Sequence, residues 1–272
     1  MIGRRSIPLS VFIAVAALLL VFVAVAPAVW LMVIALQPPG ADLHSFTGGF
    51  TLRNFVVAWR DGQLAGPLLN SVLVTLGRAG LNVLLASLAA YPLARMAFRG
   101  RDTFAVILLC TMMIPEQVIL VPMFRIVVGL GLYDTLIAVI LPFSVNAFGI
   151  FMCRQAFLSI PLSLEEAARV DGAGSLRTWW HVMLPLAAPA LSTLALFSII
   201  GAWSELLWPL IVLQSRDSFT LPVAVTSLMG QFSTNLRAAY AAAVLALLPI
   251  IFVFILLQRF LKPELFGGAV KG

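Results

Sequence analysis

The sequence predicts an all-α, polytopic membrane protein, and two observations support this fold class. Of the 272 residues, 62% are hydrophobic and only 10% are charged, far from the composition of water-soluble globular proteins. The apolar residues lie in runs of about twenty or more, the length that a helix needs to cross a hydrocarbon core of about 30 Å. A helix satisfies its own backbone hydrogen bonds inside the bilayer, so such runs are expected to form a helical bundle.

Six such runs predict six transmembrane helices in a single domain, residues 1–272. They cover approximately residues 9–36, 68–94, 104–128, 136–157, 186–213 and 238–261. The first run could also be a cleaved secretory signal with Ala24-Val25-Ala26 at its end. It continues past Pro27 to Leu36, however, which favours an uncleaved span. Residues 37–66 are polar and are expected to form a loop with a short helix at Leu52–Trp59.

The basic residues predict the orientation of these helices. Eleven of the seventeen Lys and Arg residues lie in the segments that share a side with the termini, five lie opposite, and Arg78 lies inside a span. Arg95, Arg99 and Arg101 crowd one very short loop on the richer side. By the positive-inside rule, both termini are cytoplasmic. The net charge of +6 needs no nucleic acid to explain it, because no clustered basic face is present.

Residues 158–185 form the longest polar interruption and are expected to fold as a helix–turn–helix elbow on the cytoplasmic side. Ser163 and Glu166 have the spacing of a capping box, which predicts the start of a first short helix. Gly172 and Gly174 then interrupt that helix. Ser175 is expected to cap a second helix over Leu176–Met183, and Pro185 suits the first turn of the helix that follows.

An alternative for the same segment is an amphipathic helix on the membrane surface, anchored by Trp179 and Trp180. The glycine break favours the compact elbow instead. Gly172 in particular is expected to occupy a turn with positive φ. A folded elbow between two membrane helices gives a soluble partner a surface to bind.

Four motifs resemble the permease subunits of ATP-binding-cassette (ABC) importers, in the carbohydrate branch. They are EEAARVDGAG from Glu165, which matches the EAA loop of that family, LPLAAPAL from Leu184, WSELLWPL from Trp203, and the terminal GGAVKG. In the third motif the family usually has Asn after the first Trp, where this chain has Ser204. The resemblance covers most of the chain from about Asn70 onward.

This resemblance implies an elbow that docks into a separate ATPase subunit and transmits its motion. The residues it assigns to ATPase coupling are Glu165, Glu166, Ala167, Ala168, Asp171, Gly172, Leu184 and Pro185. It also implies that the basic tail, residues 262–272, reaches the ATPase dimer through Gly268, Ala269, Val270 and Lys271. Composition alone would make that tail a frayed terminus.

Polar side chains at membrane depth are the candidates for a translocation path, because such groups are costly and functional by default. The candidates are Arg78, Asn82, Glu116, Asn146, Ser204, Glu205 and Trp208. Arg78 and Asn82 are one helical turn apart. A neutralising pair of Arg78 with Glu205 or Glu116 remains an alternative to a role in the path. For Trp208 the alternative is an aromatic belt at the outer membrane interface.

The sequence therefore predicts the transmembrane permease subunit of an ABC importer for a carbohydrate or a polyol phosphate. It would be half of a pore in the bacterial inner membrane and would work by alternating access. The resemblance implies as partners a homologous second permease, an ATPase dimer, an extracytoplasmic solute-binding protein and membrane lipid. The chain has no phosphate-loop motif, so ATP and Mg are expected in the ATPase subunits. No catalytic residue, resident cofactor or metal site is expected. The alternatives are an importer of a non-sugar solute and an ion-coupled secondary transporter.

Overall fold

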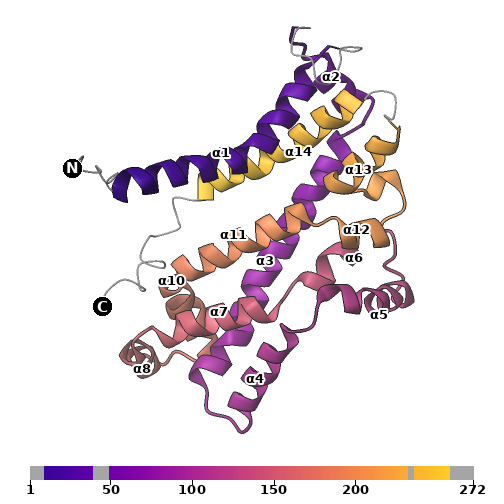
Figure 1. Cartoon of the computed structure of the whole chain (residues 1–272). Helices are drawn as coiled ribbons and strands as arrows, with labels where there is room; N and C mark the ends of the chain where they lie inside the picture. The colour runs from indigo at the N-terminus through magenta and orange to yellow at the C-terminus, as the bar shows by residue number, and fades with distance from the viewer. Residues whose placement is uncertain (1–8, 39–48, 232–235, 258–272) are drawn as a thin grey trace, which may run out of the picture. The chain divides into compact units, whose positions relative to one another are not determined.

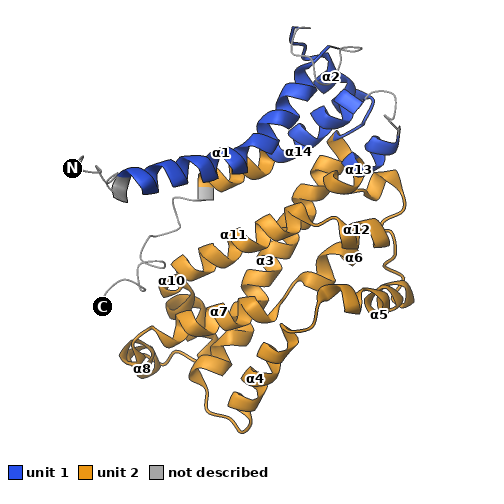
Figure 2. Ribbon diagram, in the orientation of Figure 1, with its two compact units in different colours: residues 1–64, 225–248 blue, residues 65–224, 249–272 orange. Residues whose placement is uncertain are grey.

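The structure is a computed structural model that describes residues 9–38, 49–231 and 236–257, and these residues contain helices and no strand. The helices are α1 (Leu9–Leu36), α2 (Arg53–Arg60), α3 (Ala65–Arg95), α4 (Arg101–Thr111), α5 (Glu116–Gly129), α6 (Leu136–Ile140), η1 (Leu141–Phe143), α7 (Ala147–Leu158), α8 (Leu162–Val170), α9 (Ser175–Thr178), η2 (Trp179–Met183), α10 (Leu184–Leu186), α11 (Ala188–Ser204), α12 (Leu207–Val212), η3 (Arg216–Ser218), α13 (Leu221–Gln231) and α14 (Leu236–Leu257) (Figure 1). The predicted all-α class is confirmed. The chain divides into two compact units, residues 1–64 with 225–248 and residues 65–224 with 249–272 (Figure 2).

In the first unit, a buried amide joins the end of α1 to α2. The side-chain nitrogen of Asn54 donates to the carbonyls of Ala35 at 2.8 Å and Gln37 at 2.7 Å. These carbonyls belong to the C-terminal end of α1, where backbone acceptors have no partner within the helix. The short helix predicted at Leu52–Trp59 is confirmed as α2, and Asn54 explains why it is held there.

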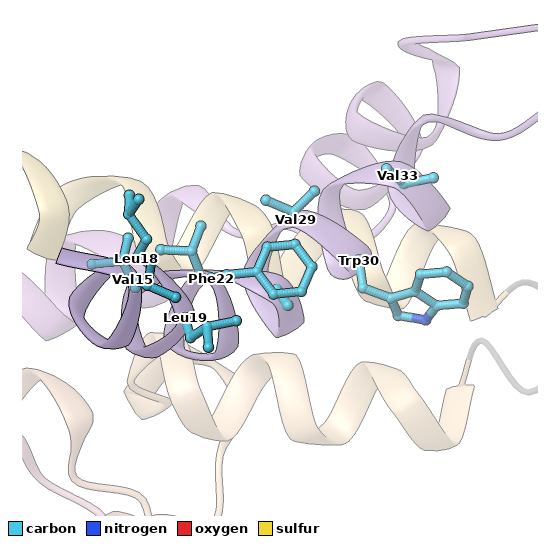
Figure 3. Close-up of a pocket in the computed structure, with 10 residues that line it drawn as sticks. Val15, Leu18, Leu19, Phe22, Val29, Trp30 and Val33 are labelled. Carbon is cyan, nitrogen blue, oxygen red and sulfur yellow. The ribbon is translucent and has the colours of Figure 1, made fainter. Parts of the chain in front are cut away.

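The surface of α1 is apolar along most of its length. A shallow hollow of about 800 Å³ follows this helix alone, and its lining includes Leu18, Phe22 and Trp30 (Figure 3). Phe22 and Leu18 are 71% and 69% exposed in the isolated chain. Such a surface suits lipid chains or another helix and cannot hold a polar solute.

In the second unit, α3 is the central helix and packs along α7 and α11 (Figure 1). Small side chains permit this close packing: Ala86 and Ala90 of α3 are fully buried, and Cys153 of α7 is 1% exposed. Between membrane helices, small residues allow backbones to approach closely and gain dispersion energy. The same cluster includes Trp179 and Met183 of η2, so the elbow shares one apolar core with α3, α7 and α11.

Three single helices are long and apolar enough to span a membrane, namely Val11–Leu36, Ala65–Arg95 and Leu236–Leu256. Three further apolar pairs are bent, by 99° between α4 and α5, by 48° between the segment Leu136–Phe143 and α7, and by 81° between the segment Ser175–Leu186 and α11. The predicted spans 104–128 and 136–157 are therefore interrupted. Helix α13 lies between two predicted spans, in a stretch for which the sequence predicted no element.

Prolines account for the break between α4 and α5 and for a further break, between α11 and α12. Pro115 precedes α5 with an extended backbone and disfavours helix at the residue before it, so α4 cannot run on into α5. Pro209 lies in the first turns of α12, where its ring would clash with the carbonyl of Glu205, four residues earlier. The predicted span 186–213 accordingly ends at Ser204 and resumes as α12.

Asp134 ties the turn before α6 to the segment after α12. Its carboxylate accepts from the backbone nitrogens of Gln214 at 2.8 Å and Ser215 at 3.0 Å. The bond from Gln214, assisted by those from Ser215 and Ser218, holds the pKa of this carboxyl below its usual value. Because φ at Asp134 is +60°, Asn is the conservative replacement, since it tolerates this conformation.

We expect Asp134→Asn to weaken this tie by on the order of 1 kcal/mol, because a charged acceptor becomes neutral. A lowered pKa stabilises the folded chain above the unfolded value of about 3.9, and the contribution is lost as the pH falls below it. The protection factors of the Gln214 and Ser215 amides, which correct for the intrinsic pH dependence of exchange, should therefore fall at low pH in the native chain and be lower already at pH 7 in the variant. Equal exchange in both proteins at pH 7 would contradict this assignment.

Candidate functional site

A polar cavity of about 350 Å³ lies in the second unit among α3, α5, η1, α7 and α11. It brings together five of the seven residues predicted for a translocation path: Arg78, Asn82, Glu116, Asn146 and Glu205. Their apolar neighbours include Phe143, Phe148 and Phe197. The ring centroids of Phe148 and Phe197 lie 6.1 Å apart, in edge-to-face geometry. Hydrogen-bonding groups beside aromatic rings suit a solute that carries both hydroxyl groups and CH surface.

Helix interruptions place the polar groups of this cavity. Glu116 is the first residue of α5. The side-chain oxygen of Asn146 accepts from the nitrogen of Gly149 at 2.7 Å and so caps α7. Glu205 accepts from the nitrogens of Leu207 at 3.0 Å and Trp208 at 3.3 Å at the start of α12. Each break therefore exposes backbone donors and supplies a side chain that satisfies them or complements the positive end of the helix.

Arg78 lies in the cavity without direct carboxylate contact. Its guanidinium carbon is 4.8 Å from the ring centroid of Phe143, in cation–π geometry. Among the described residues no ion pair within 4.0 Å joins it to Glu116 or Glu205, and one of its terminal nitrogens is buried without a hydrogen-bond partner. The neutralising contact weighed from sequence is therefore not formed, although all three charges line the same cavity.

Asn82 is the most deeply buried polar group of the cavity, at 3% exposure. Its nitrogen donates to the hydroxyl of Ser198 at 2.9 Å, and its oxygen has no partner among the described residues. Sequence reasoning missed Ser198 and the three phenylalanines. Spacing could have indicated Ser198, because it precedes Glu205 by seven residues and so lies on the same face of a helix.

Trp208 and Ser204 lie outside the cavity lining. Trp208 is 1% exposed, and its indole nitrogen donates to the carbonyl of Ala138 at 2.9 Å. It packs with Val74, Val139 and other apolar residues in a buried cluster. The structure gives Trp208 a packing role within the chain, rather than a place in the path or in an interfacial belt.

Gly149 offers a steric test of the cavity. A Cβ at this position would lie 2.9 Å from the side-chain oxygen of Asn82 and 3.1 Å from that of Asn146. We expect Gly149→Ala to cost about 1–3 kcal/mol through overpacking and to displace both amides, so that solute uptake falls more than protein yield. Gly201→Ala is the matched control on the same cavity, because its Cβ would meet no atom within 4 Å. Similar uptake by both variants would contradict a role for the amides.

The predicted elbow forms from α8 and the segment Ser175–Leu186. Gly172 has φ +78°, as predicted, and it ends α8. The nitrogen of Gly172 bonds to the carbonyl of Arg169 at 3.1 Å, and that of Ala173 bonds to Ala168 at 2.9 Å. These are the two bonds of a Schellman motif, which requires a left-handed residue at this position.

The start signals of both elbow helices were wrong. Helix α8 begins at Leu162 after Pro161, and no side chain caps it, so Ser163 lies inside the helix and forms no capping box. The second helix begins at Ser175 itself, after Gly174, again without a side-chain cap. Proline in the first turn of α10 agrees with the prediction for Pro185. Pro161 has the extended backbone of a residue that leads into a helix, but it carries no side-chain acceptor.

Most residues assigned to ATPase coupling lie on the outer surface of the elbow. Glu166, Ala167, Asp171, Gly172 and Pro185 are exposed, while Ala168 and Leu184 are half-buried. Two apolar side chains that sequence reasoning did not single out, Val170 and Leu176, are 87% and 67% exposed beside them. Glu165 differs, because it is buried at 3% exposure. The tail residues Gly268, Ala269, Val270 and Lys271 lie outside the described residues.

Long apolar helices that break around a polar cavity define a membrane transport protein, in which irregular backbone is tolerated because it lines the cavity. The sequence profile of one family, described as binding-protein-dependent transport system inner membrane component, matches residues 82–267. The chain belongs to this family.

Individual relatives cover nearly the whole chain. The arabinooligosaccharides transport system permease protein AraQ of Halalkalibacterium halodurans is 33% identical and covers 99% of both chains. The diacetylchitobiose uptake system permease protein DasC of Streptomyces coelicolor is 32% identical over 99% of this chain and 100% of its own. A crystal structure of a bacterial ABC transporter involved in import of the acidic polysaccharide alginate contains a similar chain, with a TM-score of 0.82, 26% identity and coverage of 96% and 100%.

Proposed function

We propose that this chain is the transmembrane permease subunit of an ABC importer for a carbohydrate, and that the polar cavity is part of the path of the sugar. The observation that carries the proposal is the convergence of five separated polar residues on one cavity inside a chain of this family. Relatives named for arabinooligosaccharides, melibiose and trehalose transport support a sugar as the solute.

A second hollow beside the cavity supports a continuous path. It has a volume of about 450 Å³ and shares Glu116, Phe143, Asn146 and Phe148 with the first. Small rotations of the aromatic side chains between the two would open or close a passage. Such a passage fits alternating access, in which the helices rock between outward- and inward-facing states.

Six spans follow if each bent pair contributes one crossing, the third through α11 rather than through the elbow segment Ser175–Leu186, together with the three long helices. In this arrangement both termini and the elbow are cytoplasmic, as the basic residues indicate. The exposed face of the elbow, with Val170 and Leu176 at its apolar centre, is the surface that we assign to the ATPase. Exposed apolar residues rimmed by polar ones are typical of a docking site.

The remaining partners are a homologous second permease, which completes the pore, and an extracytoplasmic solute-binding protein. ATP and Mg are bound by the ATPase dimer, and this chain performs no covalent chemistry. The test is reconstitution of the chain with these partners in proteoliposomes. We expect uptake of a labelled sugar that requires both internal ATP and the external binding protein.

Two other outcomes would replace this proposal. Uptake driven by an ion gradient without ATP would indicate a secondary transporter, with Glu116 and Glu205 as ion or proton sites. A binding protein that retains only non-carbohydrate ligands would indicate an importer of the same class for another solute.

A further inference from the structure

A buried ionic cluster lies at the base of the elbow, at Tyr91, Arg95 and Glu165. The hydroxyl of Tyr91 donates to one carboxylate oxygen of Glu165 at 3.0 Å. The Nε of Arg95 lies 3.4 Å from the other oxygen. The side chains of Arg95 and Glu165 are only 8% and 4% exposed. Glu165 therefore faces the membrane helices, and it cannot present its carboxylate to a partner as the exposed Glu166 does.

The same arginine also joins the end of α7 to the cluster. Arg95 donates to the carbonyl of Phe157 at 2.7 Å and to that of Ile160. Phe157 lies in the last turn of α7 and Ile160 lies two residues beyond its end, where a cation is favoured. A second bond joins the same two helices: Arg154 of α7 donates to the carbonyl of Leu93 in α3 at 3.2 Å. Three elements, α3, α7 and α8, are thus held at one point.

Helix α3 leads from this cluster directly to the cavity. Tyr91 and Asn82 lie on the same helix, nine residues apart, which corresponds to about 14 Å at ~1.5 Å per residue; Arg78 lies one turn further on. Helix α3 is continuous over this stretch, although Pro92, between Tyr91 and Arg95, removes one intrahelical hydrogen bond near the cluster. The other described helices that line the cavity each begin or end at it. A displacement of the elbow would therefore be transmitted along α3 to the residues of this helix that line the cavity.

Stability alone does not explain the cluster, because burying charged groups costs free energy. A buried ion pair is often no more stabilising than apolar side chains of similar size, because both charges lose their hydration. Arg169, one turn along α8, also lies 3.4 Å from the carboxylate of Glu165, but its side chain is 71% exposed. The buried contacts of Glu165 with Tyr91 and Arg95 are therefore the ones that fix the position of α8 against α3. Apolar contacts from Phe157, Trp179 and Met183 already surround this point. The ionic cluster adds a fixed orientation to them.

We infer that Tyr91, Arg95 and Glu165 are positioning residues that fix the elbow to α3, so that movement of the elbow shifts Arg78 and Asn82 in the cavity. This inference rests on the proposed function. It assigns Glu165 a role distinct from that of its neighbour Glu166: Glu165 transmits the movement within this chain, whereas Glu166 contacts the ATPase.

The test compares Glu165→Gln with Glu166→Gln in the complete importer, reconstituted in proteoliposomes. The amide can still accept from Tyr91 but loses the charge that pairs with Arg95. We expect Glu165→Gln to assemble normally with the ATPase and to hydrolyse ATP, while the sugar transported per ATP falls several-fold. Glu166→Gln should instead weaken ATPase association, with an unchanged ratio in the complexes that do assemble. A purely structural role of Glu165 would lower the amount of complex and leave the ratio intact.

Tyr91→Phe provides a second variant if Glu165→Gln fails to accumulate, because it removes one hydroxyl and keeps the ring packed on Phe157 at 6.2 Å. Tyr91→Phe should also lower the amount of sugar transported per ATP hydrolysed. Spin labels at the exposed Leu164 of α8 and Leu84 of α3, with both cysteines replaced by Ala, should give a narrow distance distribution that broadens in either variant. An unchanged ratio and an unchanged distribution would overturn the inference. Absence of ATP-driven uptake in the unmodified complex would instead overturn the proposed function.

Discussion

Gly172→Asp should leave the chain folded and inserted but reduce ATP-driven uptake by about tenfold or more, as expected when ~2 kcal/mol is lost at the centre of an interface. Gly172 adopts φ +78°, and a Cβ there would meet no atom within 4 Å. The elbow itself therefore has room for the side chain. The left-handed conformation costs an L-residue about 1–2 kcal/mol, and Asp is among the residues that tolerate it best.

Gly172→Asp is expected to act at the elbow surface that we assign to the ATPase. A carboxylate would project from the Schellman turn beside Asp171 and the exposed Val170, into a cleft where the resemblance places small residues. Gly174→Asp is the matched control, because Gly174 has φ −72° and Asp can cap the helix that follows. Uptake and ATPase co-purification are measured for both. Normal uptake by Gly172→Asp would count against docking of the elbow.

Arg78→Met should have a comparably large effect, through the cavity. Methionine keeps much of the apolar stem but removes the guanidinium and its contact with Phe143. A hydrogen bond from a charged group is worth about 1.5–3 kcal/mol, so uptake should fall about tenfold to a hundredfold if the solute uses the free terminal nitrogen. Arg78→Lys keeps the charge without the planar stack, and it should retain intermediate uptake.

The carboxylates provide a second measurement on Arg78. Without this cation, Glu116 and Glu205 share the cavity uncompensated, and a charge at membrane depth costs about 2.5–3.5 kcal/mol on insertion scales. Glu205→Gln in the same chain should therefore restore the thermal stability that Arg78→Met loses, but not the uptake. The amide still accepts from Leu207 and Trp208, so α12 keeps its cap. If Glu205→Gln restored uptake as well as stability, the role of Arg78 would be only to compensate the charge of the carboxylates.

Local signals in the sequence predicted the features that depend on neighbours along the chain. Gly172 specified a left-handed turn because other residues strain there, and the structure has that turn. The polar residues Arg78, Asn82, Glu116, Asn146 and Glu205 were expected together because no other surroundings suit them at membrane depth, and one cavity contains all five. Capping was predicted less well, because Pro161 began α8 without any polar side chain.

Side-chain direction could not be predicted, because it depends on partners far away in sequence. Glu165 and Glu166 are adjacent and chemically identical, yet they point about 100° apart on a helix. Only the packing of α8 against Tyr91 and Arg95, more than sixty residues earlier, decides which one is buried. Trp208 likewise pairs with Ala138, seventy residues away, and so lies in the core.

By itself the sequence determined the membrane class, the elbow and the identity of most polar cavity residues, because composition, turn chemistry and the cost of buried charge are local properties. The tertiary structure alone decided where the helices break around the cavity, that Ser198 and three phenylalanines join it, and that Glu165 binds inward. These outcomes arise from contacts between distant segments, whose free energies exceed the weak preferences of any single stretch of chain.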